Sequence, residues 1–226
     1  MRAAIAHLNR YIATPHVSKH RVFAWLRSGY IPDHELIVFA RDDDYFFGVL
    51  HSTAHELWAR RQGTQLREVE SGFRYTPTST FETFPFPWPP GREPAEDQSP
   101  LVAAIAHAAR HLVALRDGWL NPPAQEIGVT VSQSMLNRRT LTNLYNDLDH
   151  YRRHVKGKTR SPRQWDKETQ SLIPLDIIEE LDHIHTALDH AVLDAYGWPH
   201  TLTDDQILER LLALNLERAR EAQSDH

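Results

Sequence analysis

The spacing of hydrophobic and polar residues is strand-like over the first 83 residues of the chain. Four short runs rich in β-branched and aromatic residues occur there, at residues 10–15, 20–26, 35–40 and 45–51. The first two runs, which flank a short polar segment, predict one β-hairpin. The last two predict a second hairpin that turns at the polar segment Arg41–Asp44.

A helical spacing interrupts and then replaces this pattern. Ser52 is a suitable N-cap for a helix over residues 53–62, which Gly63 would end. From residue 100 onwards, apolar residues recur every three or four positions. Four more helices are expected there, over residues 100–119, 138–154, 177–195 and from Thr203, with a frayed tail at 219–226.

The proline-rich segment 84–100 separates the two patterns. Its six prolines exclude a helix or a central strand. We interpret this segment as a semi-rigid linker. The predicted fold class is therefore α+β, with a mixed α/β unit over residues 1–83 followed by an all-α helical bundle over residues 101–226.

The composition is that of an ordinary globular protein, with no cysteine and a formal net charge of −5. Disulfides and thiolate sites are therefore excluded. No apolar run is long enough for a membrane span, and the N-terminus lacks the apolar core of a secretory signal, so a cytoplasmic location is expected. Against this acidic background, residues 152–167 hold seven basic residues and one acidic residue, which suggests a phosphate contact.

Residues 119–126, WLNPPAQE, resemble part of an active-site tetrad. Enzymes that methylate the amino group of adenine in DNA hold the extruded base with an Asn/Asp-Pro-Pro-aromatic sequence. Here Ala124 follows Asn121–Pro123, and no glycine-rich loop follows a predicted strand. We interpret the paired prolines as the terminator of the preceding helix.

Three longer strings occur in order along most of the chain and carry a family resemblance. They are YFFGVLHSTAHELW, FETFPFPWP and AYGWPHTLTDDQILERLLALN. Together they resemble the C-terminal part of MmeI-like (type IIL) adenine-specific DNA methyltransferases and restriction-modification enzymes. The resemblance implies a target-recognition domain over residues 1–83 and a C-terminal helical domain over residues 101–226. It leaves open whether the recognition domain is complete at its start.

The same resemblance implies that DNA recognition and methyl transfer take place in different modules. Methyl transfer and the binding of S-adenosylmethionine belong to a methyltransferase domain that these residues do not contain. No cofactor and no catalytic residue are therefore expected here. The expected partners are double-stranded DNA and a methyltransferase catalytic domain on a separate or missing segment.

Candidate DNA contacts are the cations, hydroxyls and acidic groups that bind phosphates and base edges. Three segments supply them: a predicted turn at residues 14–21, the segment 64–80 with its hydroxyls up to Thr80, and the basic loop between helices. The resemblance places base-reading side chains in the second segment. The candidates are Lys19, Arg21, Arg67, Glu70, Ser71, Arg74, Thr76, Lys156, Lys158 and Arg160.

Other interpretations of the sequence stay open. The chain could be a self-sufficient methyltransferase that uses Asn121–Pro123, or an interaction protein or gene remnant that binds the intact methyltransferase. Histidine pairs four residues apart, such as His51 and His55, have the spacing of helical zinc ligands. They lack a third ligand and the H-E-x-x-H arrangement, so no metal site is expected.

Overall fold

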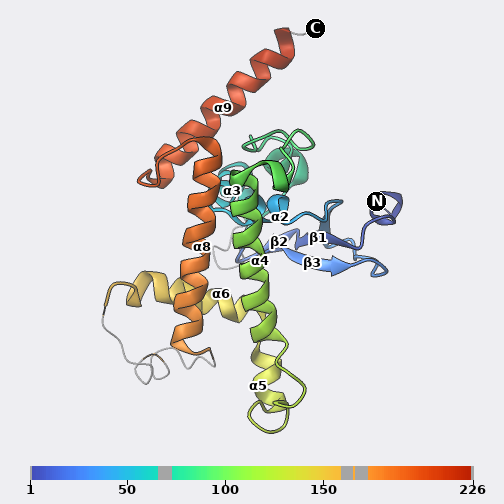
Figure 1. The fold of residues 1–226 in the computed structure, drawn as a ribbon, viewed down its shortest axis with the longest axis vertical. Helices are drawn as coiled ribbons and strands as arrows, with labels where there is room; N and C mark the ends of the chain where they lie inside the picture. Colours follow the sequence, from blue (N-terminus) through green and yellow to red (C-terminus); the bar gives the residue numbers. More distant parts are fainter. Residues whose placement is uncertain (1, 66–72, 159–164, 166–172, 225–226) are drawn as a thin grey trace. The chain divides into compact units, whose positions relative to one another are not determined.

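The computed structural model describes residues 2–65, 73–158, 165 and 173–224 (Figure 1). Backbone contacts divide the chain into two compact units, one of residues 1–109 with 188–226 and one of residues 110–187. The proline-rich segment therefore lies inside the first unit. The assignment of residues 1–83 to a target-recognition domain and of residues 101–226 to a C-terminal helical domain stays a prediction.

The first unit contains two small antiparallel sheets (Figure 1). In one sheet β1 is central, and its Ile12 lies opposite Trp25 of β3 and Phe39 of β4. This arrangement confirms the first predicted hairpin, and it adds β4 on the other side of β1. The strand order is β3-β1-β4 in this sheet and β2-β6-β5 in the other. The strands are β1 (Arg10–Pro15), β2 (Val17–Ser18), β3 (Ala24–Arg27), β4 (Leu36–Phe39), β5 (Thr64–Gln65) and β6 (Phe73–Arg74).

The helices account for most of the remaining described residues. They comprise α1 (Arg2–Ile5), α2 (Asp44–His51), α3 (Thr53–Gln62), α4 (Pro100–Leu120), α5 (Gln133–Arg138), α6 (Leu141–His150), α8 (Leu175–Tyr196) and α9 (Asp204–Ser224), with short π-helical turns at Pro77–Phe81 and Tyr151–Val155 and a 3₁₀ turn at Glu96–Gln98. Together with the small sheets, they confirm the α+β fold class.

The second predicted hairpin is wrong, because residues 45–51 form α2 rather than a strand. Asp43 caps this helix, and its carboxylate accepts a hydrogen bond from Phe46 N at 2.8 Å. Every residue from Tyr45 to His51 is buried, so the helix has no polar face and its sequence lacks the helical alternation. Gly48 permits close packing, since a Cβ there would lie 2.7 Å from Ile105 Cγ2 in α4.

Aromatic side chains form the core of the first unit. Phe46 of α2 stacks on Phe86 with ring centroids 5.0 Å apart, and Phe23 meets Tyr75 edge to face at 6.2 Å. These four side chains are at most 2% exposed. Burial of so much aromatic surface supplies a large hydrophobic stabilisation.

The proline-rich segment, for which the sequence predicts a semi-rigid linker, packs against helices. Phe84 and Phe86 are buried, and the carbonyl of Pro85 accepts a hydrogen bond from the Tyr196 hydroxyl at 2.8 Å. Arg218 of α9 donates to Phe86 O at 2.6 Å. Residues 84–99 contain no α-helix or strand, as predicted, and Phe84 and Phe86 anchor the segment in the core.

The second unit contains all of α5 and α6, together with the later turns of α4 and the first turns of α8. Buried apolar side chains come from three of these helices, namely Leu112, Leu144, Leu148, Ile178 and Leu181. A polar contact joins α6 to α8, where Tyr145 and His185 lie 3.0 Å apart between Oη and Nε2. The predicted second helix ends as regular α-helix at His150 and continues as a π-helical turn.

The last helix confirms a predicted cap and corrects a predicted end. Thr203 N donates to Gln206 Oε1 at 2.9 Å, and Gln206 N donates to Thr203 Oγ1 at 3.4 Å, which is the expected capping box. α9 then continues to Ser224, through most of the tail that was expected to fray. Local charge and helix propensity extend it, since the tail residues are helix formers.

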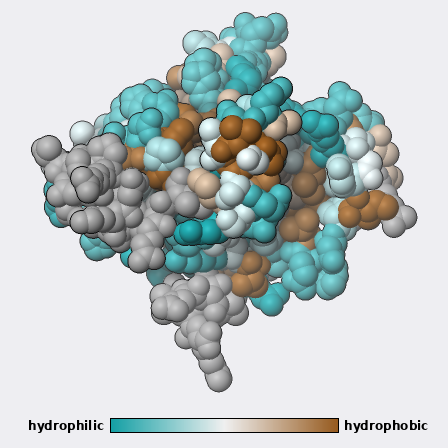
Figure 2. All heavy atoms as spheres, turned by 90° about the horizontal axis from the view of Figure 1, so that it is seen from below, coloured by the Kyte–Doolittle hydropathy of each residue, from teal (hydrophilic) through white to brown (hydrophobic). Residues whose placement is uncertain are grey.

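The surface drawn in Figure 2 is mostly hydrophilic and carries separate hydrophobic patches. Exposed large apolar side chains include Tyr30, Ile31, Val129, Leu212 and Leu216. No helix in the described part of the chain is long and apolar enough to cross a membrane.

Candidate nucleic-acid interface

The second small sheet places two of the candidate cations close together in the fold. Arg74 is exposed in β6, and its Cα partner in β2 is Val17. Lys19 is also exposed and follows β2 directly. Tyr75 N donates to His16 O at 2.8 Å and continues the pairing past the strand ends. The sheet therefore holds Arg74 in β6 close to Lys19, which directly follows the neighbouring strand β2.

Arg21, the third candidate cation of this region, is only 6% exposed. Its Nη2 donates to Phe73 O at 3.1 Å, and its Nη1 donates to Thr14 Oγ1 at 3.1 Å and to Pro15 O. Burial lowers the pKa of Arg21 to about 10, which still leaves it charged at neutral pH. The guanidinium thus joins β1 to β6 inside the protein and is not presented to a phosphate.

Arg60 is a cation near this sheet that the sequence did not single out. Its guanidinium lies 5.1 Å from the ring centroid of Phe73, while that of Arg21 lies 4.8 Å from the same ring. Arg60 also pairs with Glu56 one helical turn earlier, at 2.6 Å. It belongs to the predicted helix, so only the tertiary fold shows that it lies beside β6.

The hydroxyl-rich segment after β6 forms the π-helical turn Pro77–Phe81. Thr76 is half-buried, and its carbonyl accepts from Thr80 N at 2.8 Å and from Thr80 Oγ1 at 2.6 Å. Thr80 is fully buried and its hydroxyl is bonded within the turn, which leaves Thr78 as the exposed hydroxyl. Of the predicted phosphate contacts here, Thr76, Thr78 and Ser79 keep access to solvent, and Thr80 does not.

Four of the candidate residues lie outside the described part of the chain. They are Arg67, Glu70, Ser71 and Arg160. The first three belong to the segment that the family resemblance marks as base-reading. Their roles stay predictions.

The basic loop of the second unit is partly neutralised by an internal carboxylate. Lys156 Nζ lies 2.7 Å from Asp182 Oδ2, and Arg152 Nε lies 2.6 Å from Asp182 Oδ1. Burial of Asp182 favours its neutral form, but the hydrogen bonds from Lys156 and Arg152 outweigh burial and lower the pKa of this carboxyl. Lys158 is exposed two residues later. Lys156 therefore forms an ion pair with α8 through Asp182, while part of its side chain is exposed to solvent.

Asn121 has the geometry of a helix end. It is exposed directly after α4, and both its backbone N and its Nδ2 donate to Asp117 O, at 2.9 and 3.3 Å. The prolines that follow cannot continue the helix. The local hydrogen bonds agree with the interpretation of this sequence as a helix terminator.

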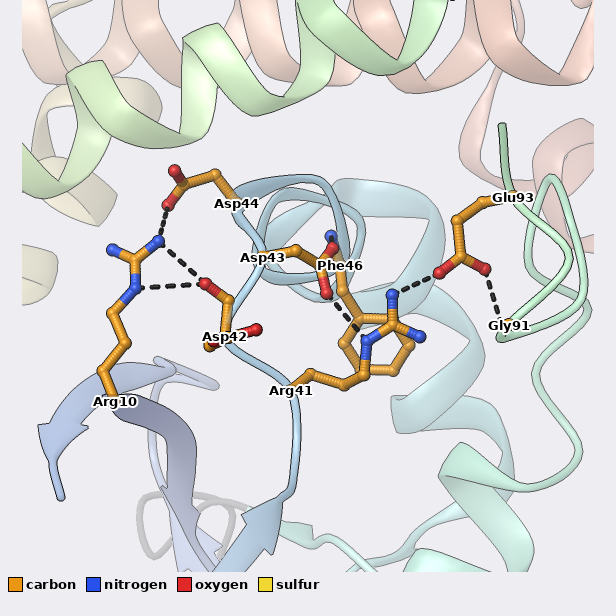
Figure 3. A network of polar contacts seen from close by, with 8 residues as sticks. All are labelled: Arg10, Arg41, Asp42, Asp43, Asp44, Phe46, Gly91 and Glu93. Carbon is orange, nitrogen blue, oxygen red and sulfur yellow. Dashed lines mark hydrogen bonds and ion pairs between the residues drawn. The ribbon is translucent and has the colours of Figure 1, made fainter. Parts of the chain in front are cut away.

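The aspartate-rich segment that was expected to form a hairpin turn instead organises the start of α2 (Figure 3). Arg10 Nη2 donates to Asp44 Oδ1 at 2.8 Å, and Arg41 Nε donates to Asp43 Oδ2 at 2.7 Å. Arg41 also pairs with Glu93. Burial opposes the charge of Arg41, but the hydrogen bonds to these two carboxylates outweigh it and raise the pKa of Arg41.

The carboxylates of Asp43 and Asp44 are each hydrogen-bonded to an arginine, so we interpret both as structural. Among the described residues, no three His, Asp or Glu side chains come together in a way that could hold a metal ion. His51 and His55, for example, are both buried, and His51 Nε2 contacts the backbone of Phe23.

Comparison with known proteins gives a structural likeness. The chain is similar to part of the solved structure of the type IIL restriction-modification enzyme MmeI in complex with DNA, with a TM-score of 0.60 and 20% sequence identity. The match covers 95% of this chain and 22% of that enzyme's chain. No protein-family model and no curated protein matches this chain. The resemblance predicted from the sequence strings is therefore confirmed as a shared fold.

Proposed function

We propose that this chain is the DNA-sequence-recognition module of an S-adenosylmethionine-dependent, adenine-specific DNA methyltransferase of a restriction-modification system. Methyl transfer would take place in a catalytic domain outside these residues. The observation that supports this proposal is the fold, which over 95% of the chain is similar to part of a restriction-modification enzyme solved with DNA. The chain spans 22% of the length of that enzyme.

The exposed cations of the second sheet offer a physical basis for DNA binding. Arg74 lies in β6 and Lys19 directly follows the adjacent strand β2, so both can reach the same stretch of a phosphate backbone. Arg74 can also form paired hydrogen bonds with O6 and N7 of a guanine edge in the major groove. The predicted base-reading residues Arg67, Glu70 and Ser71 immediately precede β6 in the sequence.

The self-sufficient methyltransferase is the weaker hypothesis. It requires the Asn121 amide to accept a hydrogen bond from the adenine amino group in an enclosed site. Asn121 is exposed, and its amide nitrogen bonds the carbonyl of Asp117 in its own helix. DNA binding separates the remaining hypothesis from this proposal. A recognition module binds a duplex, whereas a protein that only binds the intact methyltransferase does not.

Selection from a library of random DNA duplexes tests the proposal directly. The full chain, alone and mixed with a methyltransferase catalytic domain, should enrich one duplex sequence reproducibly, with an affinity that falls steeply as salt rises. Titration with S-adenosylmethionine should give no heat with the chain alone. Absence of any DNA binding in both samples contradicts the recognition role, and micromolar binding of S-adenosylmethionine would favour the self-sufficient enzyme.

A further inference from the structure

Strand β4 is an edge of its sheet in the described part of the chain. It pairs with β1 on one side, and the sheet order β3-β1-β4 places it at the end. An edge strand carries a row of backbone N–H and C=O groups that can pair with an added strand. Proteins usually cover or interrupt such an edge, so an open edge beside a suitable cleft is informative.

The hydrogen-bond pattern shows which backbone groups of β4 face outward. His16 N donates to Glu35 O at 2.9 Å, which makes these residues a hydrogen-bonded pair in the ladder with β1. Such pairs recur at every second residue of an antiparallel ladder. The N–H and C=O groups of Val38 and Ala40 therefore point away from β1. No described residue forms a backbone hydrogen bond with them on that side.

A cleft of about 360 Å³ runs along this edge. Four consecutive residues of the chain, Ile37–Ala40, line one side of it. Because successive side chains of a strand point to opposite faces of a sheet, this lining places the cleft beside the backbone of β4. Phe46, Pro77, Phe81 and Pro90 add apolar surface to the lining.

The charged groups around the cleft are mainly acidic. Asp33 and Glu35, just before β4, have side chains 68% and 74% exposed and both contact the exposed imidazole of His34, and Glu82 is exposed in the cleft lining. Arg41 lines the cleft too, but it is paired with Asp43 and with Glu93, so its charge is compensated. This balance attracts Lys and Arg and repels phosphates.

We propose that the edge of β4 is a docking site for an extended peptide segment of a partner protein, which adds a strand to the sheet. Main-chain hydrogen bonds to Val38 and Ala40 would hold the peptide, and an apolar side chain would enter the cleft against Phe81. Lysine or arginine residues of the same segment would lie over Glu35 and Glu82. The site is separate from the DNA-binding proposal and does not depend on it.

A labelled peptide provides the probe. It has about ten residues, alternates valine with lysine, and carries one central phenylalanine, so that it is extended and basic. Fluorescence anisotropy with the full chain should show micromolar binding. The same peptide with glutamate in place of lysine should bind at least about tenfold more weakly.

Two variants of the chain separate the backbone contact from the charge contact. Val38→Pro removes the outward N–H without touching the ladder to β1, and should weaken binding at least about tenfold, whereas Val38→Ala should not. Glu82→Lys should weaken binding by several fold, whereas Glu217→Lys on the exposed face of α9 is the matched control. Circular dichroism of each variant checks the fold, and Glu82→Lys tests the proposal even where Val38→Pro unfolds the sheet.

Hydrogen exchange gives an independent measurement, since the amides of Val38 and Ala40 should become protected when the peptide binds. The proposal is overturned by equal binding of the glutamate peptide or of Glu82→Lys. It is also overturned if a single-stranded oligonucleotide displaces the peptide, which would assign the cleft to nucleic acid. Concentration-dependent dimerisation of the chain through the same edge would assign it to a second copy instead.

Discussion

The carboxylate of Asp189 accepts two hydrogen bonds from Thr53, one from the backbone N at 2.6 Å and one from the hydroxyl at 2.7 Å. Thr53 is the first residue of α3, and Asp189 lies 136 positions later in α8. The N–H groups in the first turn of a helix have no partners within that helix, and the helix dipole favours a negative charge there. The pair therefore caps α3 and fixes it to α8.

We predict that Asp189→Ala lowers the free energy of unfolding by about 1–3 kcal/mol, because a charge-assisted hydrogen bond is lost at a half-buried site. Asp189→Asn should cost less, since its amide oxygen still accepts one hydrogen bond. Urea denaturation measures both, with Glu217→Ala on α9 as the control. A loss equal to that of the control would mean that this contact does not stabilise the fold.

Arg21 should behave as a structural residue and not as a DNA contact. Arg21→Met keeps much of the packing against Phe73, but it leaves the carbonyls of Pro15 and Phe73 without their donor. We expect a loss of about 2–4 kcal/mol in the free energy of unfolding. Lys19→Met, a change at an exposed neighbour, should leave unfolding within about 0.5 kcal/mol of the parent.

Lys19 and Arg74, in contrast to Arg21, should affect DNA binding and not stability. Replacing Lys19 and Arg74 together with alanine should reduce the slope of log affinity against log salt by about two units, one for each lost phosphate contact. Stability should be unchanged because both side chains are exposed. Arg220→Ala in α9 serves as the control, and a salt slope equal to the control's would remove this sheet from the interface.

A comparison of Lys158 with Lys156 tests whether the basic loop contacts DNA. Lys158→Ala should lower the salt slope of DNA binding by about one unit and leave stability unchanged, if this loop touches DNA. Lys156→Ala should in addition destabilise the fold modestly, since it removes one of two cations from the buried carboxylate of Asp182. Comparison of the two variants by anisotropy and urea denaturation therefore distinguishes a DNA contact from an internal ion pair.

Local signals in the sequence were sufficient for several elements of the fold. The Ser52 cap and the capping box of Thr203 with Gln206 are contacts between residues three apart, so the sequence contains all that determines them. The pairing of β1 with β3 follows similarly from two apolar runs joined by a short segment. Predictions of this kind succeed because few alternative partners exist nearby.

Features that depend on distant partners could not be predicted from the sequence. Residues 45–51 are buried on all sides by segments remote in the sequence, which removes the periodicity that identifies a helix. Arg21 was expected at the surface because arginine usually is, and only the folded sheets show that it bridges them. Lys156 is similar, since its partner Asp182 lies on another helix.

A buried histidine links the fold to pH. His55 is fully buried, with Nδ1 2.8 Å from Leu50 O and Nε2 2.9 Å from the Tyr75 hydroxyl. Because a carbonyl only accepts, Nδ1 carries the proton and Nε2 accepts from the hydroxyl, which is the neutral tautomer. Burial lowers the pKa of His55 to about 3, and the pKa of His185 in the second unit is lowered to about 3 for the same main reason.

Stability should therefore fall as the solution is acidified from neutral pH. The ordinary histidine pKa is 6.5, so the unfolded chain takes up protons below that pH while the folded chain does not until about pH 3. The stabilisation is complete above pH 6.5 and is lost progressively below it, by about 2 kcal/mol per histidine near pH 5. Urea denaturation at about pH 7.5 and about pH 5 measures this loss.

His55→Gln should lower stability at neutral pH and reduce its dependence on pH, whereas the exposed His34→Gln should change neither. An unchanged pH dependence in His55→Gln would mean that the pKa of this imidazole is the same in the folded and the unfolded chain.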